Sequence, residues 1–121
     1  MNPEIIEKIR EHYEHAKKKH PYFCDRLYLS QGMSTKEDML SYLQSKLKRI
    51  RQSLAADKEC GRLCADLVLN CELVEIEEAI CLGNTAAAIE ECYDAIAVLL
   101  RIIDVLEGRQ TLGNPAKKEG K

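Results

Sequence analysis

The sequence has no apolar run of the length that a membrane span needs, which is about 20 residues. Its first residues, Met1-Asn2-Pro3-Glu4, lead directly into a charged amphipathic segment and show no signal-peptide pattern. Positive charge is not in excess either, since the formal net charge is −2 at pH 7, which gives no electrostatic basis for general nucleic-acid binding. We therefore expect a cytoplasmic protein that binds neither a membrane nor a nucleic-acid polymer.

Several local patterns are missing as well. There is no strand-length alternation bounded by hairpin signals, no internal repeat and no glycine-rich phosphate loop. The six cysteines show no zinc-knuckle spacing, and five of them fall inside expected helices. That placement favours small buried apolar residues over a metal or redox site.

Helical periodicity, in contrast, runs through most of the chain and predicts an all-α fold, a bundle of four main helices with an irregular N-terminal arm. The expected helices cover about 3–19, 34–56, 58–82 and 86–107, and the arm covers about 20–32. Residues 1–108 then form a single domain, and 109–121 form a flexible tail. The aromatic residues of the arm are expected to pack onto the body of their own subunit or its partner.

Capping residues set these expected boundaries. They are Asn2 before the first helix, a capping box of Ser34 and Glu37, Asp57 before the third helix, Asn84 or Thr85 before the fourth, and Gly83 and Gly108 at the ends of the last two.

The last two expected helices are apolar over wide arcs. On a helical wheel the dry face of the fourth is formed by Ile89, Cys92, Ile96, Leu99 and Ile103. One chain has few other helices to cover such faces, so we expect the bundle to be completed by association into a homodimer or homotetramer.

Two pairs of carboxylates stand on these same helices. Glu72 and Glu75 form the first pair and Glu91 and Asp94 the second, and residues three apart share a helix face. The short turn at Gly83 makes the two helices antiparallel neighbours, which brings the pairs to matching levels. The four carboxylates are therefore expected to form one patch. All-oxygen ligation favours a hard divalent ion, Mg²⁺ or Mn²⁺.

The spacing ExxE, then fifteen residues, then ExxD resembles the MazG-like, all-α nucleoside triphosphate pyrophosphohydrolase superfamily. The neighbouring residues agree with this resemblance: Glu78-Ala79-Ile80 follows the first pair, and Ala95-Ile96 and Leu99-Leu100-Arg101 follow the second. The chain departs from the family pattern at Cys71, where many members carry another acid, and at Val74, where they often carry glycine.

The resemblance implies an enzyme that converts a nucleoside triphosphate and water to the monophosphate and diphosphate. Glu72, Glu75, Glu91 and Asp94 would hold Mg²⁺, and a carboxylate, for which Glu75 is our choice, would accept the proton of the attacking water. The expected phosphate contacts are Arg101 of the fourth helix and Lys46 and Arg49 of the basic cluster on the second.

Two other functions are compatible with the residues. The acids could form the hydrated surface of a non-catalytic helical interaction module, because glutamate pairs at helical spacing arise by chance in many α-proteins. A carboxylate-bridged di-iron bundle would also place acids on facing helices. That class uses Glu-x-x-His motifs, however, and all three histidines lie at or before position 20.

Overall fold

The structure, a computed structural model, describes residues 2–33 and 35–111. Its regular elements are the helix α1 (Pro3–Lys19), the short 3₁₀ helix η1 (Tyr28–Gln31), and the helices α2 (Lys36–Glu59), α3 (Ala65–Cys81) and α4 (Thr85–Thr111). Every regular element of these residues is helical, so the prediction of an all-α fold with four main helices is confirmed. None of the helices in the described part of the chain combines the length and apolarity needed to cross a membrane.

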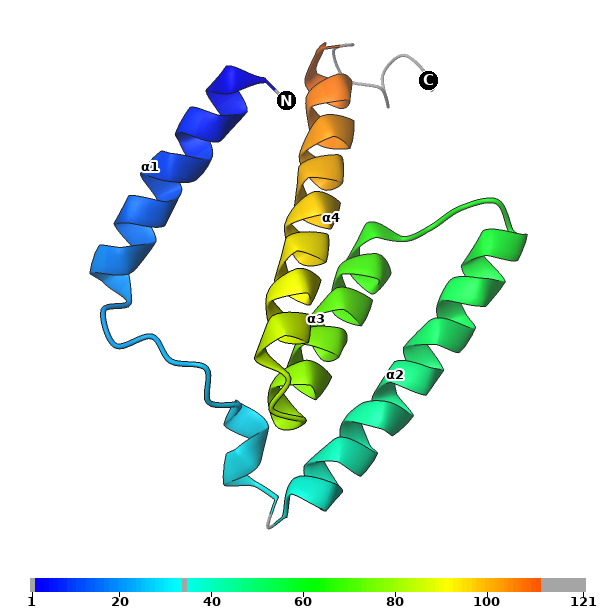
Figure 1. The fold of residues 1–121 in the computed structure, drawn as a ribbon. Helices are drawn as coiled ribbons and strands as arrows, with labels where there is room; N and C mark the ends of the chain where they lie inside the picture. Colours follow the sequence, from blue (N-terminus) through cyan, green and yellow to red (C-terminus); the bar gives the residue numbers. More distant parts are fainter. Residues whose placement is uncertain (1, 34, 112–121) are drawn as a thin grey trace.

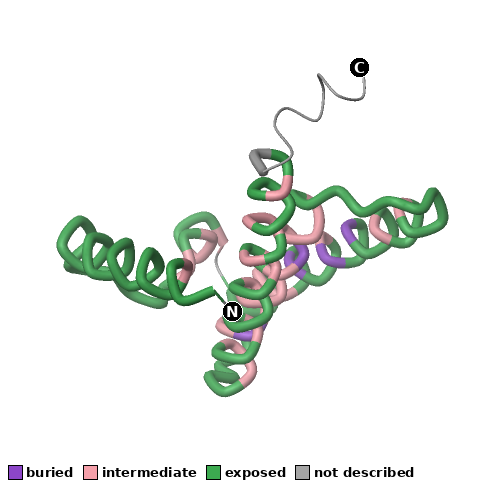
Figure 2. Tube along the Cα trace, turned by 90° about the horizontal axis from the view of Figure 1, so that it is seen from above, coloured by how far each residue is buried: buried purple, intermediate pink, exposed green. Residues whose placement is uncertain are grey.

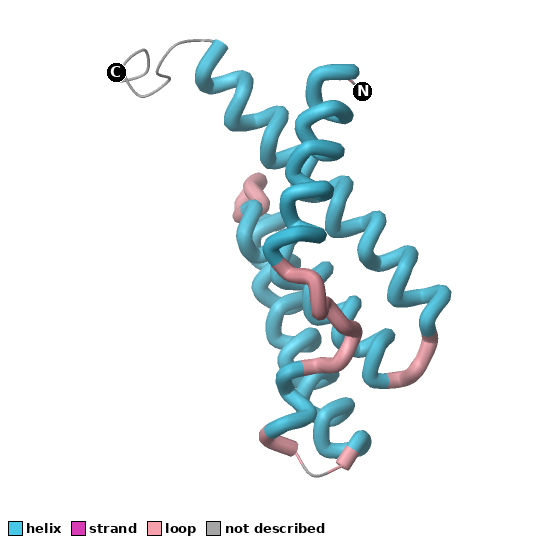
Figure 3. The backbone as a smooth tube through the Cα atoms, turned by 90° about the vertical axis from the view of Figure 1, so that its left-hand side faces the viewer, coloured by secondary structure: helices cyan, strands magenta, loops and turns pink. Residues whose placement is uncertain are grey.

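Helix α3 is the centre of the arrangement. It packs on α4 across the tight turn at Gly83 and on α2 along its other side, whereas α1 stands apart beside α4 (Figure 1). An irregular stretch and η1 link α1 to α2 (Figure 3). The aromatic side chains of this stretch, Tyr22 and Phe23 among them, are almost fully exposed. They do not pack on the body of their own chain, and packing on a partner stays a prediction.

The core lies between α2 and α3. Leu43, Leu47 and Ile50 recur every three or four residues on α2, which places them on one face of that helix. They pack against buried Cys71 and Val74 of α3. Among the described residues, none of α4 belongs to the buried core. The buried positions, shown in purple in Figure 2, all lie on α2 and α3. Helix α4 is thus covered on one side only.

The helix boundaries differ from expectation around residue 60. Helix α2 continues to Glu59 and ends at Gly61, whose φ of +75° is the left-handed conformation that glycine adopts most readily. The N–H of Gly61 donates to the Lys58 carbonyl (3.0 Å) and the N–H of Arg62 to the Asp57 carbonyl (3.1 Å), which is a Schellman motif. Asp57 does not begin a helix, because its side chain instead accepts the N–H of Cys64 across the loop (3.2 Å). Cys60 and Cys64 are therefore exposed loop residues and not buried helical ones.

Other helix ends match the sequence more closely. Asn2 accepts the N–H of Glu4 at the start of α1, as expected, and Asn84 accepts the N–H of Ala87 at the start of α4. The cap of α2 is Thr35, which accepts the N–H of Asp38; Ser34, where the capping box was expected, lies outside the described residues. Helix α4 runs through Gly108 to Thr111, four residues beyond the predicted end, and 112–121 of the expected tail lie outside the described residues.

The two kinds of glycine should respond oppositely to alanine. A Cβ would meet no atom within 4 Å at Gly61 or at Gly108, so the backbone conformation decides the effect. Gly61→Ala should lower the free energy of unfolding by about 1–2 kcal/mol, because an L-residue is strained at positive φ. Gly108→Ala should raise it by about 0.5–1 kcal/mol, because alanine loses less entropy inside a helix. Urea unfolding measures both, and shifts of the same sign would contradict this account.

Candidate metal centre

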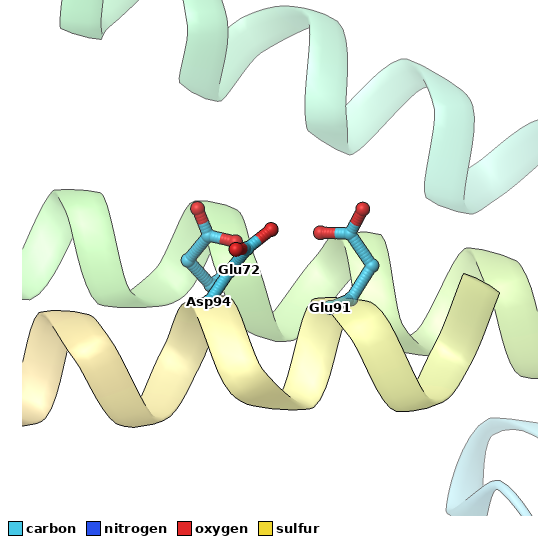
Figure 4. A group of neighbouring side chains, drawn as sticks. All are labelled: Glu72, Glu91 and Asp94. Atoms are coloured by element: carbon cyan, nitrogen blue, oxygen red, sulfur yellow. The ribbon is translucent and has the colours of Figure 1, made fainter. Parts of the chain in front are cut away.

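The α3–α4 hairpin brings acidic side chains from its two helices together. One carboxylate oxygen from each of Glu72, Glu91 and Asp94 lies within 4.8 Å of the others. Figure 4 shows the three side chains leaving the hairpin on the same side, toward α2. The expected patch is therefore present for these residues, and their role as metal ligands stays a prediction.

Glu75, the fourth predicted metal ligand, is turned toward α2. Its Oε2 accepts a hydrogen bond from the Nη2 of Arg51 at 2.9 Å, and its oxygens are not part of the 4.8 Å group. Its charge is still felt by its neighbours, since Glu75 contributes to the raised pKa values of both Glu72 and Glu91. Four carboxylates thus share one region, and one of them has a cationic partner.

The closeness of these groups makes their ionisation costly. Burial, followed by the negative charges of Glu75, Asp94 and Glu91, raises the pKa of Glu72 to about 7. Burial and the charge of Glu75 also raise the pKa of Glu91 above its ordinary value. Repulsion of this kind is relieved either by a proton or by a cation.

The donor atoms fit a hard divalent cation. The Oε2 atom of Glu72 is buried and has no hydrogen-bond partner within the described residues, so it offers a lone pair to a ligand. The donors that lie within 4.8 Å of one another are all carboxylate oxygens, with no histidine nitrogen or cysteine sulfur among them. Mg²⁺ and Mn²⁺ prefer such oxygen ligands.

Arg51 is the site residue that the sequence interpretation missed. It belongs to the basic cluster on α2, from which Lys46 and Arg49 were chosen as phosphate contacts. The signal that distinguishes it is its position next to Ile50 and four residues after Leu47, at the edge of the buried stripe of α2.

Two of the predicted phosphate-binding residues, Lys46 and Arg49, lie on other faces of α2 than Arg51. At about 100° per residue, Arg49 is about 160° and Lys46 about 140° around α2 from Arg51, which faces the carboxylates. Arg49 is exposed and Lys46 half-buried, and neither has an ion pair among the described residues. Arg101 follows Asp94 by two helical turns, roughly 10 Å along the axis of α4.

Two cavities lie near the carboxylates: one is lined by Glu75 and Glu91, and the other lies about one helical turn away from Glu72 and Asp94. The smaller, about 170 Å³, lies toward the Gly83 turn and is polar; its wall includes Arg51, Glu75, Glu78, Asn84 and Glu91. The larger, about 500 Å³, lies toward the start of α3 and is mainly apolar; its wall includes Leu63, Val68, Val98, Arg101 and Ile102. Val68 stands one turn before Glu72 and Val98 one turn after Asp94, so this groove begins next to the acids.

The raised pKa of Glu72 predicts how stability changes with pH when no divalent ion is present. The folded protein holds the Glu72 proton more tightly than the unfolded chain does. Protonated Glu72 therefore makes its full contribution to the free energy of unfolding below about pH 4.5, and this contribution is lost as the pH rises to about 7. In EDTA, Tm should fall by several degrees across this window. Glu72→Gln cannot ionise and should flatten the curve. A wild-type Tm that rises with pH over this range, or a variant with the same slope, would contradict the assignment.

Comparison with known proteins supplies no relative for this arrangement. No protein-family model, curated protein or solved structure matches the chain. The function must therefore be inferred from the acidic group, the basic side chains near it and the two cavities beside it.

Proposed function

We propose that the chain is a divalent-cation-dependent hydrolase that splits a nucleoside triphosphate into the monophosphate and diphosphate. The observation that carries this proposal is the group formed by Glu72, Glu91 and Asp94, with a buried oxygen of Glu72 left without a partner. The proposal includes membership of the MazG-like superfamily, which the ExxE and ExxD spacing resembles, and the cytoplasmic location expected from the sequence.

Glu72, Glu91 and Asp94 would hold Mg²⁺, or Mn²⁺, and Glu75 would complete the set. A bound divalent ion would neutralise polyphosphate charge and lower the pKa of a coordinated water. A carboxylate of the set would then accept the proton of the attacking water, and Glu75 is our choice because its oxygens lie outside the group formed by the other three acids. Arg51 and Arg101 offer positive charge on either side of the acids, where phosphate oxygens would lie.

The two cavities suggest how a nucleotide would lie. The phosphates need the acidic group and its cations, whereas a base and ribose need room and apolar walls. The groove of about 500 Å³ beside Val68 and Val98 supplies that room next to the acids. We place the nucleoside there, with Arg101 at the boundary between the base and the phosphates.

Glu75→Gln tests the catalytic role. The amide cannot accept the proton of water, so diphosphate release from a panel of nucleoside triphosphates with Mg²⁺ or Mn²⁺ should fall by about 10²–10⁴-fold. Glu77→Gln is the matched control and should keep wild-type turnover, because it makes the same change on the same helix but about 160° around the axis from Glu75. Wild-type turnover in Glu75→Gln, or equal losses in both variants, would exclude Glu75 as the base.

A non-catalytic interaction module is the second candidate, and its contact surface would be the exposed face of α4. Ile89, Ile96 and Ile103 recur every seven residues, with Cys92, Leu99 and Leu106 three residues after each. We call these six residues the seam. Ile89, Ile96, Leu99 and Leu106 are between 45% and 51% exposed, although apolar residues at this spacing normally meet another helix. An enzyme should bind a divalent ion tightly at its acids, whereas a simple interaction module should bind it only weakly.

We assign the seam to a second copy of the chain, which gives a homodimer or homotetramer and is compatible with either function. A cavity of about 500 Å³ separates it from the apolar face of α1, with Ile9 and Tyr13 on one wall and Ile103 on the other. Two α3–α4 hairpins packed seam to seam would form a four-helix bundle that covers these residues.

Ile96→Glu tests the association. A charge in the middle of the seam should convert the assembly to monomers, because it would have to be buried without a partner. The monomer should still fold, since Ile96 is 47% exposed in the single chain. Ala97→Glu adds the same charge to an exposed position outside the seam and should leave the assembly intact. Light scattering after size exclusion measures the masses, and a monomeric wild type would contradict the assignment.

A further inference from the structure

One ion pair connects the acidic site to the helix that covers it. The Nη2 of Arg51 on α2 lies 2.9 Å from Oε2 of Glu75 on α3. The other ion pairs found in the described residues, Glu7 with Arg10 and Glu14 with Lys17, lie within α1. The Arg51–Glu75 pair is therefore the one such contact there that joins two helices, and it ends on a carboxylate of the site.

This ion pair and a divalent cation would compete for the same oxygens. Glu72, Glu91 and Asp94 are grouped within 4.8 Å, and neighbouring Glu75 gives its Oε2 to the guanidinium of Arg51. A cation that takes Oε2 of Glu75 has to draw this oxygen away from the guanidinium. The pair is exposed on its cationic side, where the Arg51 side chain is 58% exposed, and half-buried at Glu75, which is 23% exposed; solvent at the guanidinium weakens such a contact.

The released guanidinium would remain beside the substrate. Arg51 lines the polar cavity of about 170 Å³ together with Glu75, Asn84 and Glu91, at the edge of the carboxylate group. A guanidinium presents five N–H donors in a planar fork, which fits two phosphate oxygens as well as it fits a carboxylate. Its long side chain allows it to change partner without a movement of α2.

We propose that Arg51 is an exchangeable counter-charge of the acidic site. It holds Glu75 while the site has no divalent cation, and it turns to the oxygens of a polyphosphate once a cation has taken Glu75. This inference rests on the proposed function, because it takes the carboxylates as cation ligands and a polyphosphate as the substrate. A merely structural link between α2 and α3 would behave differently, since its loss would loosen the site and weaken every ligand.

Arg51→Gln distinguishes the two roles by the sign of its effect on metal affinity. Calorimetric titration with MnCl₂ alone should show binding about three- to fivefold tighter than in the wild type, because the Arg51 guanidinium no longer competes with Mn²⁺ for Glu75. Titration of the Mn²⁺-loaded protein with inorganic pyrophosphate should show binding about tenfold weaker, because the fork is lost. Arg51→Lys keeps the charge but not the fork, so it should weaken pyrophosphate binding without the gain in Mn²⁺ affinity.

Arg49→Gln is the matched control, since it removes one guanidinium from the opposite face of α2 and should change neither affinity more than about twofold. Circular dichroism melting of each variant verifies that it is folded. Unchanged or weaker Mn²⁺ binding in Arg51→Gln, or unchanged pyrophosphate binding, would overturn the exchange role while leaving the proposed function standing. A wild-type protein that binds no Mn²⁺ would overturn the proposed function, and this inference with it.

Discussion

Like charges held close together on the α3–α4 hairpin are the constraint on which the rest of the structure depends. The Schellman end at Gly83 leaves so short a turn that α3 and α4 run back along each other. Their acids then meet at matching levels, and burial together with the neighbouring negative charges raises the pKa of Glu72. An arrangement of this kind persists when something compensates the charge, and a proton, Arg51 or a bound cation can each do so.

Helix α2 has two roles in this arrangement. With Leu43 and Leu47 it covers α3 and forms the core, and from the edge of the same face it extends Arg51 to the acids. A helix that only completed the core would need no cation at that edge. The position of Arg51, next to the buried stripe, means that packing of α2 also sets the distance between positive and negative charge.

The sequence was informative where local patterns decide the structure. The acidic pairs three residues apart and the glycine-terminated turn were enough to predict that Glu72, Glu91 and Asp94 lie together, because helical geometry is nearly invariant. The break between α2 and α3 was misplaced, because Asp57 looked like a cap while the backbone angle of Gly61 is visible only in three dimensions. Arg51 was passed over because choosing among neighbouring basic residues requires knowing which face of α2 is turned to the acids.

The partial covering of α4 has a further consequence. Glu91 and Asp94 stand on the same helix as the exposed seam, and no described residue of that helix is fully buried within the single chain. Anything that packs on the seam would also fix the rotation of α4, and with it the aim of half the acidic group. Subunit contact and site geometry would then be thermodynamically linked: ligand binding would strengthen assembly, and dilution of the protein would weaken ligand binding.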